Sequence, residues 1–307
     1  MNSDIIVSVL CIAYNHKPYI EQTLKSILEQ KTTFNYELIV HDDASNDGTT
    51  DIIKQYQKQY PAIVKPILQT ENQYSKGVCI IRDIMLPQSK GKYIAFCEGD
   101  DYWSDPEKLQ KQVDYLQQHE DYSAVVHNTE RYEQTTGKRY SMYHFGENRT
   151  LFFKDVVCEG GQSFHFSSVL TRKAVLEDRR PYIDCADKYR DYPFAILYAL
   201  SGKIHYMDKI MSVYRVVDKN SSWSQQLNSR DIMCRHWSNI NEMLETLKEE
   251  LNSEQIRIVD SVIIKNQYHI FEMRNEYRKL IEEPYLSLYK EHSFQYRFKK
   301  FLKRILS

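Results

Sequence analysis

Short apolar runs alternate with segments of helical periodicity along the first hundred residues. The runs are rich in aliphatic and β-branched residues, as expected of buried strands, and the segments between them repeat apolar residues every three or four positions. The predicted strands are Ile5–Ala13, Tyr36–His41, Val64–Gln69 and Tyr93–Cys97. Strands that alternate with helices form open, mostly parallel sheets with crossover helices. The pattern therefore predicts an α/β protein with a Rossmann-like sheet flanked by helices.

The middle of the chain is less regular. Tyr122–Asn128 is predicted to be a strand, Arg131–Arg149 a polar, tyrosine-rich loop, and Phe164–Leu170 an alternating strand that presents His165 or Ser167 to a cavity. The remaining predicted elements are a helix after Asp191 that ends at Gly202, and two short strands at Ile204–Met207 and Ile210–Arg215.

From about residue 225 the pattern becomes that of long helices. A cap signal at Asn252-Ser253 precedes an apolar stripe in which Asn266 is the lone polar member. We expect a helical hairpin that folds back on the first domain, with self-association into a homo-oligomer as the alternative. The predicted domains are an α/β domain at 1–224, with a nucleotide-binding half at about 1–105 and an acceptor half at about 106–224, and a helical extension at 225–307.

Composition narrows the function classes. The 307 residues carry a formal net charge of −1, which argues against a strongly basic nucleic-acid binder. Nine glycines leave little room for glycine-rich phosphate loops, and the six cysteines form no C-x-x-C pair. No signal segment and no apolar run of about 20 residues are present. We expect a cytoplasmic protein. Its basic, aromatic tail beyond Pro284 is either a solvated helix end or a peripheral contact with anionic lipid at the inner face of the plasma membrane.

Three carboxylates, those of Glu98, Asp100 and Asp101, crowd the end of the predicted strand Tyr93–Cys97. Acids in such a place repel one another and lose hydration unless a cation joins them. A hard divalent ion such as Mg²⁺ or Mn²⁺ is the expected cation, and such ions usually accompany a phosphate-bearing substrate. The alternative interpretation is an acidic loop that begins a helix at Ser104-Asp105-Pro106.

Two other loops end at the same edge of the predicted sheet. Tyr14-Asn15 follows the first strand and Asp42-Asp43 follows the second, and ligands of open α/β sheets bind beyond the carboxyl ends of strands. Asp42 or Asp43 could accept hydrogen bonds from a base or ribose, and Tyr14 could pack against a nucleotide. Alternatively, Asn15 caps a helix and the segment Asp42–Asp47 provides turn and cap interactions.

The sequence resembles family-2 glycosyltransferases of the GT-A fold. The resemblance rests on V-S-V-L-C-I-A-Y-N-H at Val7–His16, H-D-D-A-S-N-D-G-T at His41–Thr49 and E-G-D-D-Y-W at Glu98–Trp103, and it extends over about residues 5–220. It implies inverting transfer from a nucleoside-diphosphate sugar to a glycan or lipid-linked acceptor. It implies that Ile12, Ala13, Tyr14 and Asn15 contact the nucleotide-sugar donor. It also implies that Asp43 contacts the nucleotide base, that Asp100 contacts the ribose or the sugar, and that Asp101 binds the metal.

The resemblance also implies a catalytic base far downstream. Asp191, in R-D-Y-P-F, is the best match because Pro193 suits a first helical turn, and Asp187 and Asp184 are competitors. The acidic motif is Gly-Asp-Asp preceded by Glu98, where the family has D-x-D, and the family's Q-x-x-R-W signature of processive polymer synthesis is absent. The absence of that signature and of apolar runs long enough to span a membrane favours an enzyme that adds a single sugar to a cell-surface polysaccharide.

Two other function classes compete with a glycosyltransferase. A nucleotidyltransferase would normally carry a glycine- and lysine-rich or arginine-rich loop near the N-terminus, and Ala13-Tyr14-Asn15-His16 is not one. A non-catalytic nucleotide- or glycan-binding module would need no base such as Asp191. A Rossmann dehydrogenase does not fit, because no G-x-G-x-x-G follows the first strand.

Overall fold

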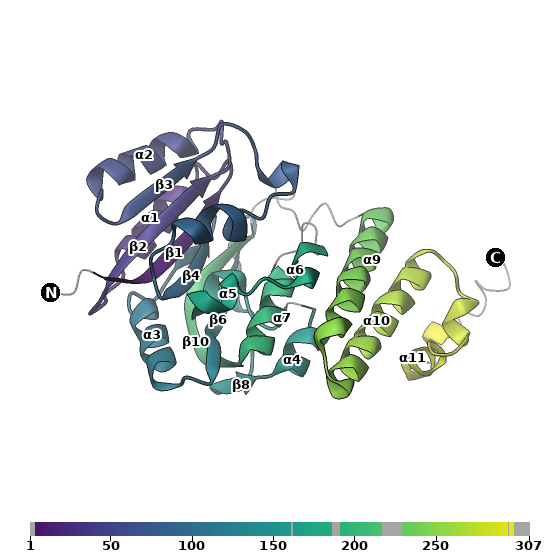
Figure 1. Ribbon diagram of the computed structural model, residues 1–307. Coiled ribbons are helices and arrows are strands. Elements are labelled where there is room, and N and C mark those ends of the chain that lie inside the picture. The colour runs from purple at the N-terminus through teal and green to yellow at the C-terminus, as the bar shows by residue number, and fades with distance from the viewer. Residues whose placement is uncertain (1–3, 161, 186–190, 217–228, 294, 298–307) are drawn as a thin grey trace. The chain divides into compact units, whose positions relative to one another are not determined.

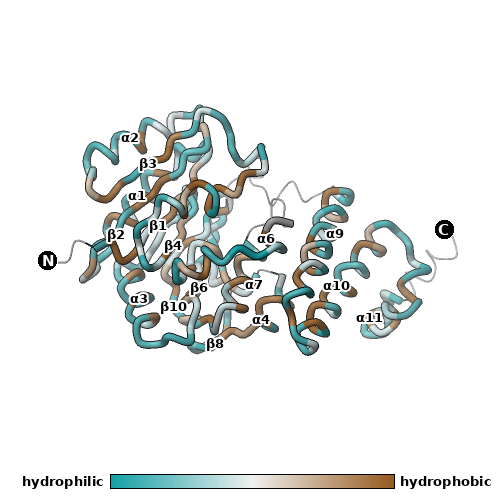
Figure 2. Tube along the Cα trace, viewed as in Figure 1, coloured by the Kyte–Doolittle hydropathy of each residue, from teal (hydrophilic) through white to brown (hydrophobic). Residues whose placement is uncertain are grey.

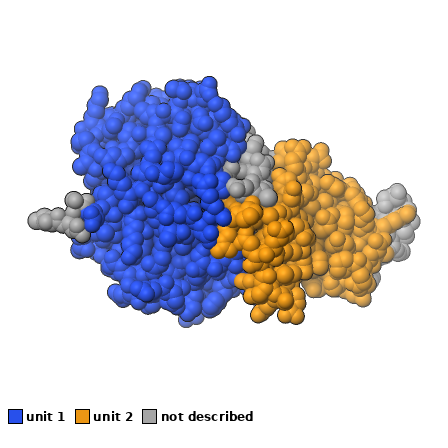
Figure 3. Space-filling model, in the orientation of Figure 1, with its two compact units in different colours: residues 1–179, 194–218 blue, residues 180–193, 219–307 orange. Residues whose placement is uncertain are grey.

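A computed structural model describes residues 4–160, 162–185, 191–216, 229–293 and 295–297. The chain divides into two compact units, shown in blue and orange in Figure 3. Unit 1 comprises residues 1–179 and 194–218, and unit 2 comprises residues 180–193 and 219–307. The segment 180–193, which the sequence placed in the first domain, thus groups with the C-terminal helices.

Four parallel strands form the first half of the sheet in unit 1 (Figure 1). In spatial order they are β3 (Val64–Leu68), β2 (Asn35–Asp42), β1 (Ile5–Ala13) and β4 (Tyr93–Glu98). All four were predicted. Ala13 pairs with Asp42, and Ile12 pairs with Glu98, so the polar residues that follow these strands emerge at one edge.

Helices cover this half of the sheet because their apolar residues recur on one side. In α1 (Ile20–Leu28) the side chains of Ile20, Leu24 and Ile27 are fully buried and join one core cluster with the odd-numbered residues of β1. The same cluster includes residues of α2 (Thr49–Gln59) and α3 (Lys108–Gln118). Between β3 and β4 the chain forms a short π-helical segment, η2 (Ile80–Met85), which lies between the 3₁₀ turns η1 (Tyr74–Lys76) and η3 (Leu86–Gln88).

The second half of the sheet is mixed, so the expectation of a mostly parallel sheet holds only for the first half. A short strand, β9 (Leu170–Arg172), lies antiparallel between β4 and β6 (Tyr122–Glu133). The remaining strands are β10 (Lys203–Val216), parallel to β6, and the antiparallel β5 (Tyr102–Trp103), β7 (Arg139–Ser141) and β8 (Arg149–Leu151). Helices α4 (Phe153–Cys158), α5 (Lys173–Glu177) and α7 (Asp191–Ser201) complete the α/β arrangement.

Three predictions for this half were wrong in detail. The segment predicted as a loop at Arg131–Arg149 contains a hairpin, because β7 pairs with the extended end of β6. The strand predicted at Phe164–Leu170 is a 3₁₀ turn, η4 (Phe166–Ser168), followed by β9. The two last strands are one strand, β10, whose register shifts between Met207 and Ile210. The helix α7 begins at Asp191 and stops before Gly202, as predicted.

Unit 2 is helical. Its elements are α6 (Pro181–Cys185), α9 (Arg230–Leu247), η5 (Lys248–Glu250), α10 (Ser253–Met273), η6 (Lys279–Ile281) and α11 (Leu286–Glu291). Figure 2 shows hydrophobic and hydrophilic residues alternating along α9 and α10, which pack on each other as the predicted hairpin. The buried Asn266 amide donates a hydrogen bond to the Asn241 side chain (2.9 Å). Residues 298–307 of the predicted basic tail lie outside the described residues. No helix in the described ranges has the length and apolar character needed to span a bilayer.

The start of α10 offers a test of the fold. The Asn252 side chain accepts hydrogen bonds from the backbone N–H groups of Glu254 and Gln255 (both 3.0 Å). Asn252→Ala removes this cap and should lower the free energy of unfolding by about 1 kcal/mol, whereas Asn252→Gly should cost only a few tenths. Urea denaturation of both variants measures the difference. Equal costs would contradict a capping role.

Candidate active site

The acidic cluster forms where β4 ends. The Gly99 N–H donates to the carbonyl of Ile12 (2.8 Å), and the Asp101 N–H donates to that of Glu98 (3.0 Å), so the chain turns tightly across the end of β1. A Cβ atom on residue 99 would lie 2.7 Å from His16 Nδ1 and 2.9 Å from the Ile12 carbonyl oxygen. Glycine is required here because the backbone of β1 approaches so closely.

Asp101 is the most buried acid of the cluster, with no exposed surface. Its carboxylate accepts hydrogen bonds from Ser167 Oγ (2.6 Å) and from the Arg215 N–H (3.0 Å). The Thr23 hydroxyl lies 2.6 Å from its carbonyl oxygen and 3.0 Å from that of Gly99. Burial, together with the neighbouring Asp100, raises the pKa of Asp101 well above its ordinary value. The fold therefore pays a desolvation cost to hold a carboxylate at this point.

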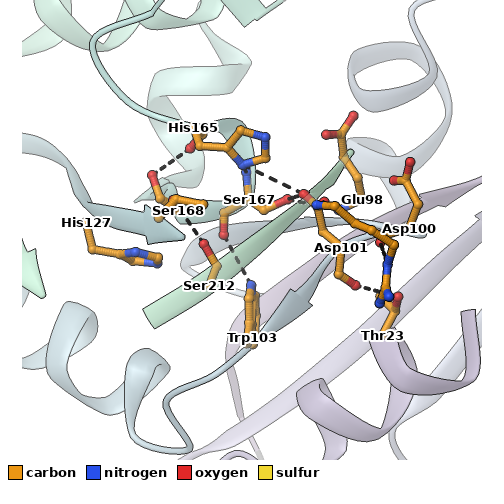
Figure 4. A network of polar contacts seen from close by, with 12 residues as sticks. Thr23, Glu98, Asp100, Asp101, Trp103, His127, His165, Ser167, Ser168 and Ser212 are labelled. Atoms are coloured by element: carbon orange, nitrogen blue, oxygen red, sulfur yellow. Dashed lines mark hydrogen bonds and ion pairs between the residues drawn. The ribbon is translucent and has the colours of Figure 1, made fainter. Parts of the chain in front are cut away.

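His165 joins Glu98 and Asp101 as the third side chain that could bind a metal ion. It immediately precedes η4, and Figure 4 shows it facing Asp101 beside Ser167. Its Nδ1 atom lies 3.7 Å from Asp101 Oδ2, and one ligand atom each from Glu98, Asp101 and His165 lie within 4.8 Å of one another. Burial lowers the pKa of His165 to about 4, so the ring is neutral at pH 7 and its contact with Asp101 is not an ion pair. Neutral imidazole is the form that binds metal ions.

These three side chains fit a divalent cation. Carboxylate oxygens suit Mg²⁺ and Mn²⁺, and an imidazole nitrogen favours a transition metal over Mg²⁺. A cation beside Asp101 would also offset the cost of ionising a buried carboxylate next to Asp100. The sequence singled out Asp101 for the metal, left the role of Glu98 undecided, and expected only that His165 or Ser167 would face a cavity.

Asp100 and Arg215 lie on the other side of the turn. The Asp100 side chain is 27% exposed, and its Oδ2 atom lies 3.9 Å from His16 Nε2. The Arg215 guanidinium donates to the Asp100 carbonyl oxygen (2.8 Å) and lies between the rings of Tyr19 and Tyr102, 4.9 and 5.3 Å from their centroids. Sequence reasoning missed the role of Arg215, because no local pattern links residues more than a hundred positions apart.

The loops after β1 and β2 adjoin each other, as predicted. Tyr14 is 47% exposed, as a ring that stacks on a ligand would be. Asn15 has a positive φ of 55°, and its side-chain oxygen accepts a hydrogen bond from the Asn46 N–H (2.9 Å). The Asp43 carboxylate is buried and accepts hydrogen bonds from the N–H groups of Gln73 (2.7 Å) and Tyr74 (3.1 Å). Asp43 thus fixes the loop after β3 at the same edge of the sheet.

Two acids of the second loop have the turn and cap contacts that were weighed as an alternative. Asp42 accepts hydrogen bonds from the Ser45 N–H (3.1 Å) and the Thr50 hydroxyl. Asp47 accepts hydrogen bonds from the N–H and hydroxyl of Thr49 at the start of α2 (2.9 and 2.6 Å). These contacts account for Asp42 and Asp47 without a ligand.

Asp191 is the first residue of α7, and the residue as a whole is solvent-exposed although protein atoms surround its carboxyl group. Desolvation by the surrounding protein raises its pKa to about 6, which suits a group that exchanges protons near neutral pH. Asp191 belongs to unit 2, and the acidic cluster belongs to unit 1. Of the competing acids, Asp184 lies in α6 and Asp187 lies outside the described residues.

The mixed sheet, with its acidic cluster at the strand ends, defines the GT-A glycosyltransferase fold. The structure of TarS from S. aureus in complex with UDP-GlcNAc matches with a TM-score of 0.64 at 19% identity, over 87% of this chain and 73% of that one. The mannosyltransferase PcManGT from Pyrobaculum calidifontis, solved with GDP-Man and Mn²⁺, matches with a TM-score of 0.59 at 15% identity, over 99% and 85%.

The family model for glycosyl transferase family 2 matches residues 8–178, and the chain belongs to this family. An uncharacterized protein of Mycobacterium tuberculosis is 31% identical over 211 residues, which are 68% of this chain and 58% of the relative. The chain thus spans less than two thirds of that relative's length. WfaP of Escherichia coli, a UDP-Glc:alpha-D-GlcNAc-diphosphoundecaprenol beta-1,3-glucosyltransferase, is 31% identical over 183 residues, which are 59% of this chain and 67% of WfaP.

Thr23 provides a test of how the acidic turn is held. Thr23→Val keeps the side-chain shape but removes the hydroxyl that contacts the carbonyls of Gly99 and Asp101. It should lower the free energy of unfolding by about 1 to 2 kcal/mol and weaken Mn²⁺ binding. Urea denaturation and Mn²⁺ titration measure the two effects.

Thr171→Val is the matched control. The Thr171 hydroxyl is also buried and donates to the carbonyl of Ser123 (2.9 Å), but it makes no contact with the acidic turn. This variant should lose similar stability and bind Mn²⁺ as the wild type does. Equal Mn²⁺ affinity in both variants would show that Thr23 does not shape the site.

Proposed function

We propose that this protein is an inverting glycosyltransferase. It transfers a sugar from a nucleoside-diphosphate sugar to a hydroxyl group of a glycan or lipid-linked acceptor, with the help of Mg²⁺ or Mn²⁺ and with Asp191 as the base. The observation that supports the proposal best is the cluster of Glu98, Asp101 and His165 at the end of β4. Family membership and the fold support the same reaction class.

The donor would lie across the edge formed by the loops after β1, β2 and β4. Ile12, Ala13 and Tyr14 would line the nucleotide, beside Asn15, because β1 ends at Ile12 and Ala13, and Tyr14 follows it where the three loops meet. Asp43 would accept a hydrogen bond from the base, since each oxygen of its carboxylate accepts only one hydrogen bond among the described contacts. Asp100, being partly exposed, would contact the ribose or the sugar.

The departing diphosphate needs positive charge beside it, whereas the acceptor hydroxyl needs a base that takes its proton. Glu98, Asp101 and His165 would hold the cation, which supplies positive charge to the departing diphosphate. At the acceptor, Asp191 takes the hydroxyl proton while the acceptor oxygen bonds to the anomeric carbon and the bond from that carbon to the diphosphate breaks. A carboxyl group whose pKa is about 6 is ionised at pH 7 and remains basic enough for this step.

The acceptor is proposed to belong to cell-surface polysaccharide synthesis. WfaP acts on a diphosphoundecaprenol-linked sugar, and another relative, TuaG of Bacillus subtilis, is named as a putative teichuronic acid biosynthesis glycosyltransferase. A lipid-linked acceptor at the inner face of a membrane would agree with the basic C-terminal tail of the sequence.

Removal of the Asp101 charge tests the metal site. Asp101→Asn keeps the size of the side chain but replaces a ligand oxygen with an amide, so the rise in Tm with Mn²⁺ and UDP- or GDP-sugars should disappear. Asp51→Asn, an equal charge change at an exposed position in α2, should leave that rise intact. A normal ligand-induced rise in Asp101→Asn would exclude Asp101 as a ligand.

The role of Asp191 predicts both a variant and a pH profile. Asp191→Asn should bind donor normally but lose transfer by about 100-fold or more, because it cannot accept the proton. In the wild type, activity should fall about tenfold per pH unit below the Asp191 pKa of about 6 and level off above it, because only the ionised carboxylate is a base. Steady-state kinetics from pH 5 to 8 measure both. Undiminished turnover in the variant would assign the base to another residue.

A further inference from the structure

A buried lysine lies behind the candidate metal site. Lys108, the first residue of α3, has no exposed surface. Its ammonium donates to the side-chain oxygen of Gln112 (2.8 Å) and lies 4.1 Å from the centroid of the Trp103 ring. Within the described part of the chain, no carboxylate lies within ion-pair distance of it. A cation buried with only an amide and an aromatic face as partners is costly, and burial lowers its pKa to about 7.

Both partners of Lys108 hold the turn that carries the site. Trp103 donates its indole N–H to the carbonyl of Ser167 (3.2 Å), a bond visible in Figure 4. Gln112 donates its amide N–H to the carbonyl of the next residue, Ser168 (2.8 Å), and to that of Val125 (3.0 Å). Two consecutive carbonyls of η4 are therefore held by the two side chains that contact the ammonium.

The opposite side of the same turn faces the metal ligands. Ser167 Oγ donates to Asp101 Oδ2 (2.6 Å) and accepts from the N–H of Glu98 (3.2 Å). His165 lies next to the turn, and its carbonyl accepts a hydrogen bond from the Ser168 hydroxyl (2.6 Å). A displacement of η4 would thus move the His165 ring and remove one of the two hydrogen-bond donors to the Asp101 carboxylate. The three candidate ligands depend on the placement of this short turn.

We propose that Lys108 is a positioning residue for the metal site, acting through Trp103 and Gln112 on the turn between His165 and Ser168. The Lys108 Nζ group orients the amide of Gln112 through its hydrogen bond and lies against the indole face, so that both N–H groups point at η4. A methionine would fill a similar volume without burying a charge, which makes a packing role alone a poor reason for a lysine here. The inference rests on the proposed metal site and adds a residue that does not touch the metal.

Mn²⁺ affinity of the full-length protein tests the proposal, measured without substrate from the electron paramagnetic resonance signal of free Mn²⁺. Lys108→Met should weaken binding about tenfold, the lower end of the range for loss of an outer-shell partner. Lys111→Met is the control, because Lys111 lies on the same helix, is partly exposed, and pairs with the exposed Glu107 and with Asp105, which keeps a second ion pair with Lys209. It should bind Mn²⁺ with wild-type affinity.

Trp103→Phe gives a second, independent measurement. It keeps a ring next to the ammonium but loses the N–H that holds Ser167, so it should also weaken Mn²⁺ binding. If Lys108→Met does not fold, this variant decides the matter, and unchanged affinity in Trp103→Phe would overturn the proposal.

The outcomes separate the inference from the proposed function. If Lys108→Met has a lower Tm but the Mn²⁺ affinity of the wild type, the lysine is purely structural and the inference is wrong, while the metal site stands. If the wild-type protein does not bind Mn²⁺, the metal site itself is refuted, and the role of Lys108 is refuted with it.

Discussion

The buried carboxylate of Asp101 is the constraint on which the site depends. A carboxylate without exposed surface must find its hydrogen bonds within the protein, and here the donors come from η4 and from the end of β10, 66 and 114 residues away in the sequence. Its carbonyl oxygen is held by Thr23 of α1. Any arrangement that separated these segments would leave a charge or a polar group unpaired. The free-energy cost of leaving such a group buried and unpaired keeps the segments together.

The first half of the fold could be predicted from the sequence because its signals are local. A continuous apolar run such as Ile5–Ala13 indicates a strand that is buried on both faces, and the helical spacing of Ile20, Leu24 and Ile27 indicates the helix that covers it. Parallel strands then bring their carboxyl ends to one edge, so the convergence of three loops follows from topology. No comparable signal links His165 or Arg215 to Asp101, because those contacts exist only after the chain has folded.

The β6–β7 hairpin in the second half was harder to predict because its strands are stabilised there by polar pairs. The hairpin of β6 and β7 is held by the ion pair of Arg139 with Glu130 (2.5 Å) and by the guanidinium of Arg139 over the ring of Tyr132 (4.0 Å). A strand of this kind has no apolar face, so its sequence is that of a loop. The opposite error occurred around Ser167, where alternation over a few residues suggested a strand, although a 3₁₀ turn can produce the same short pattern.

The charges of Asp101 and Lys108 are kept apart by neutral groups. An ammonium in direct contact with Asp101 would take the position proposed for a metal ion and would neutralise the carboxylate proposed to bind it. In this chain the indole of Trp103 contacts the Lys108 ammonium and donates to the Ser167 carbonyl, and the Ser167 hydroxyl donates to Asp101. Two neutral side chains therefore link the two charged groups, and only one hydrogen bond from them reaches the carboxylate. The carboxylate is thereby fixed in place while it keeps lone pairs for a cation. Such a separation would explain why a lysine and an aspartate are both buried near the end of one strand and are not paired with each other.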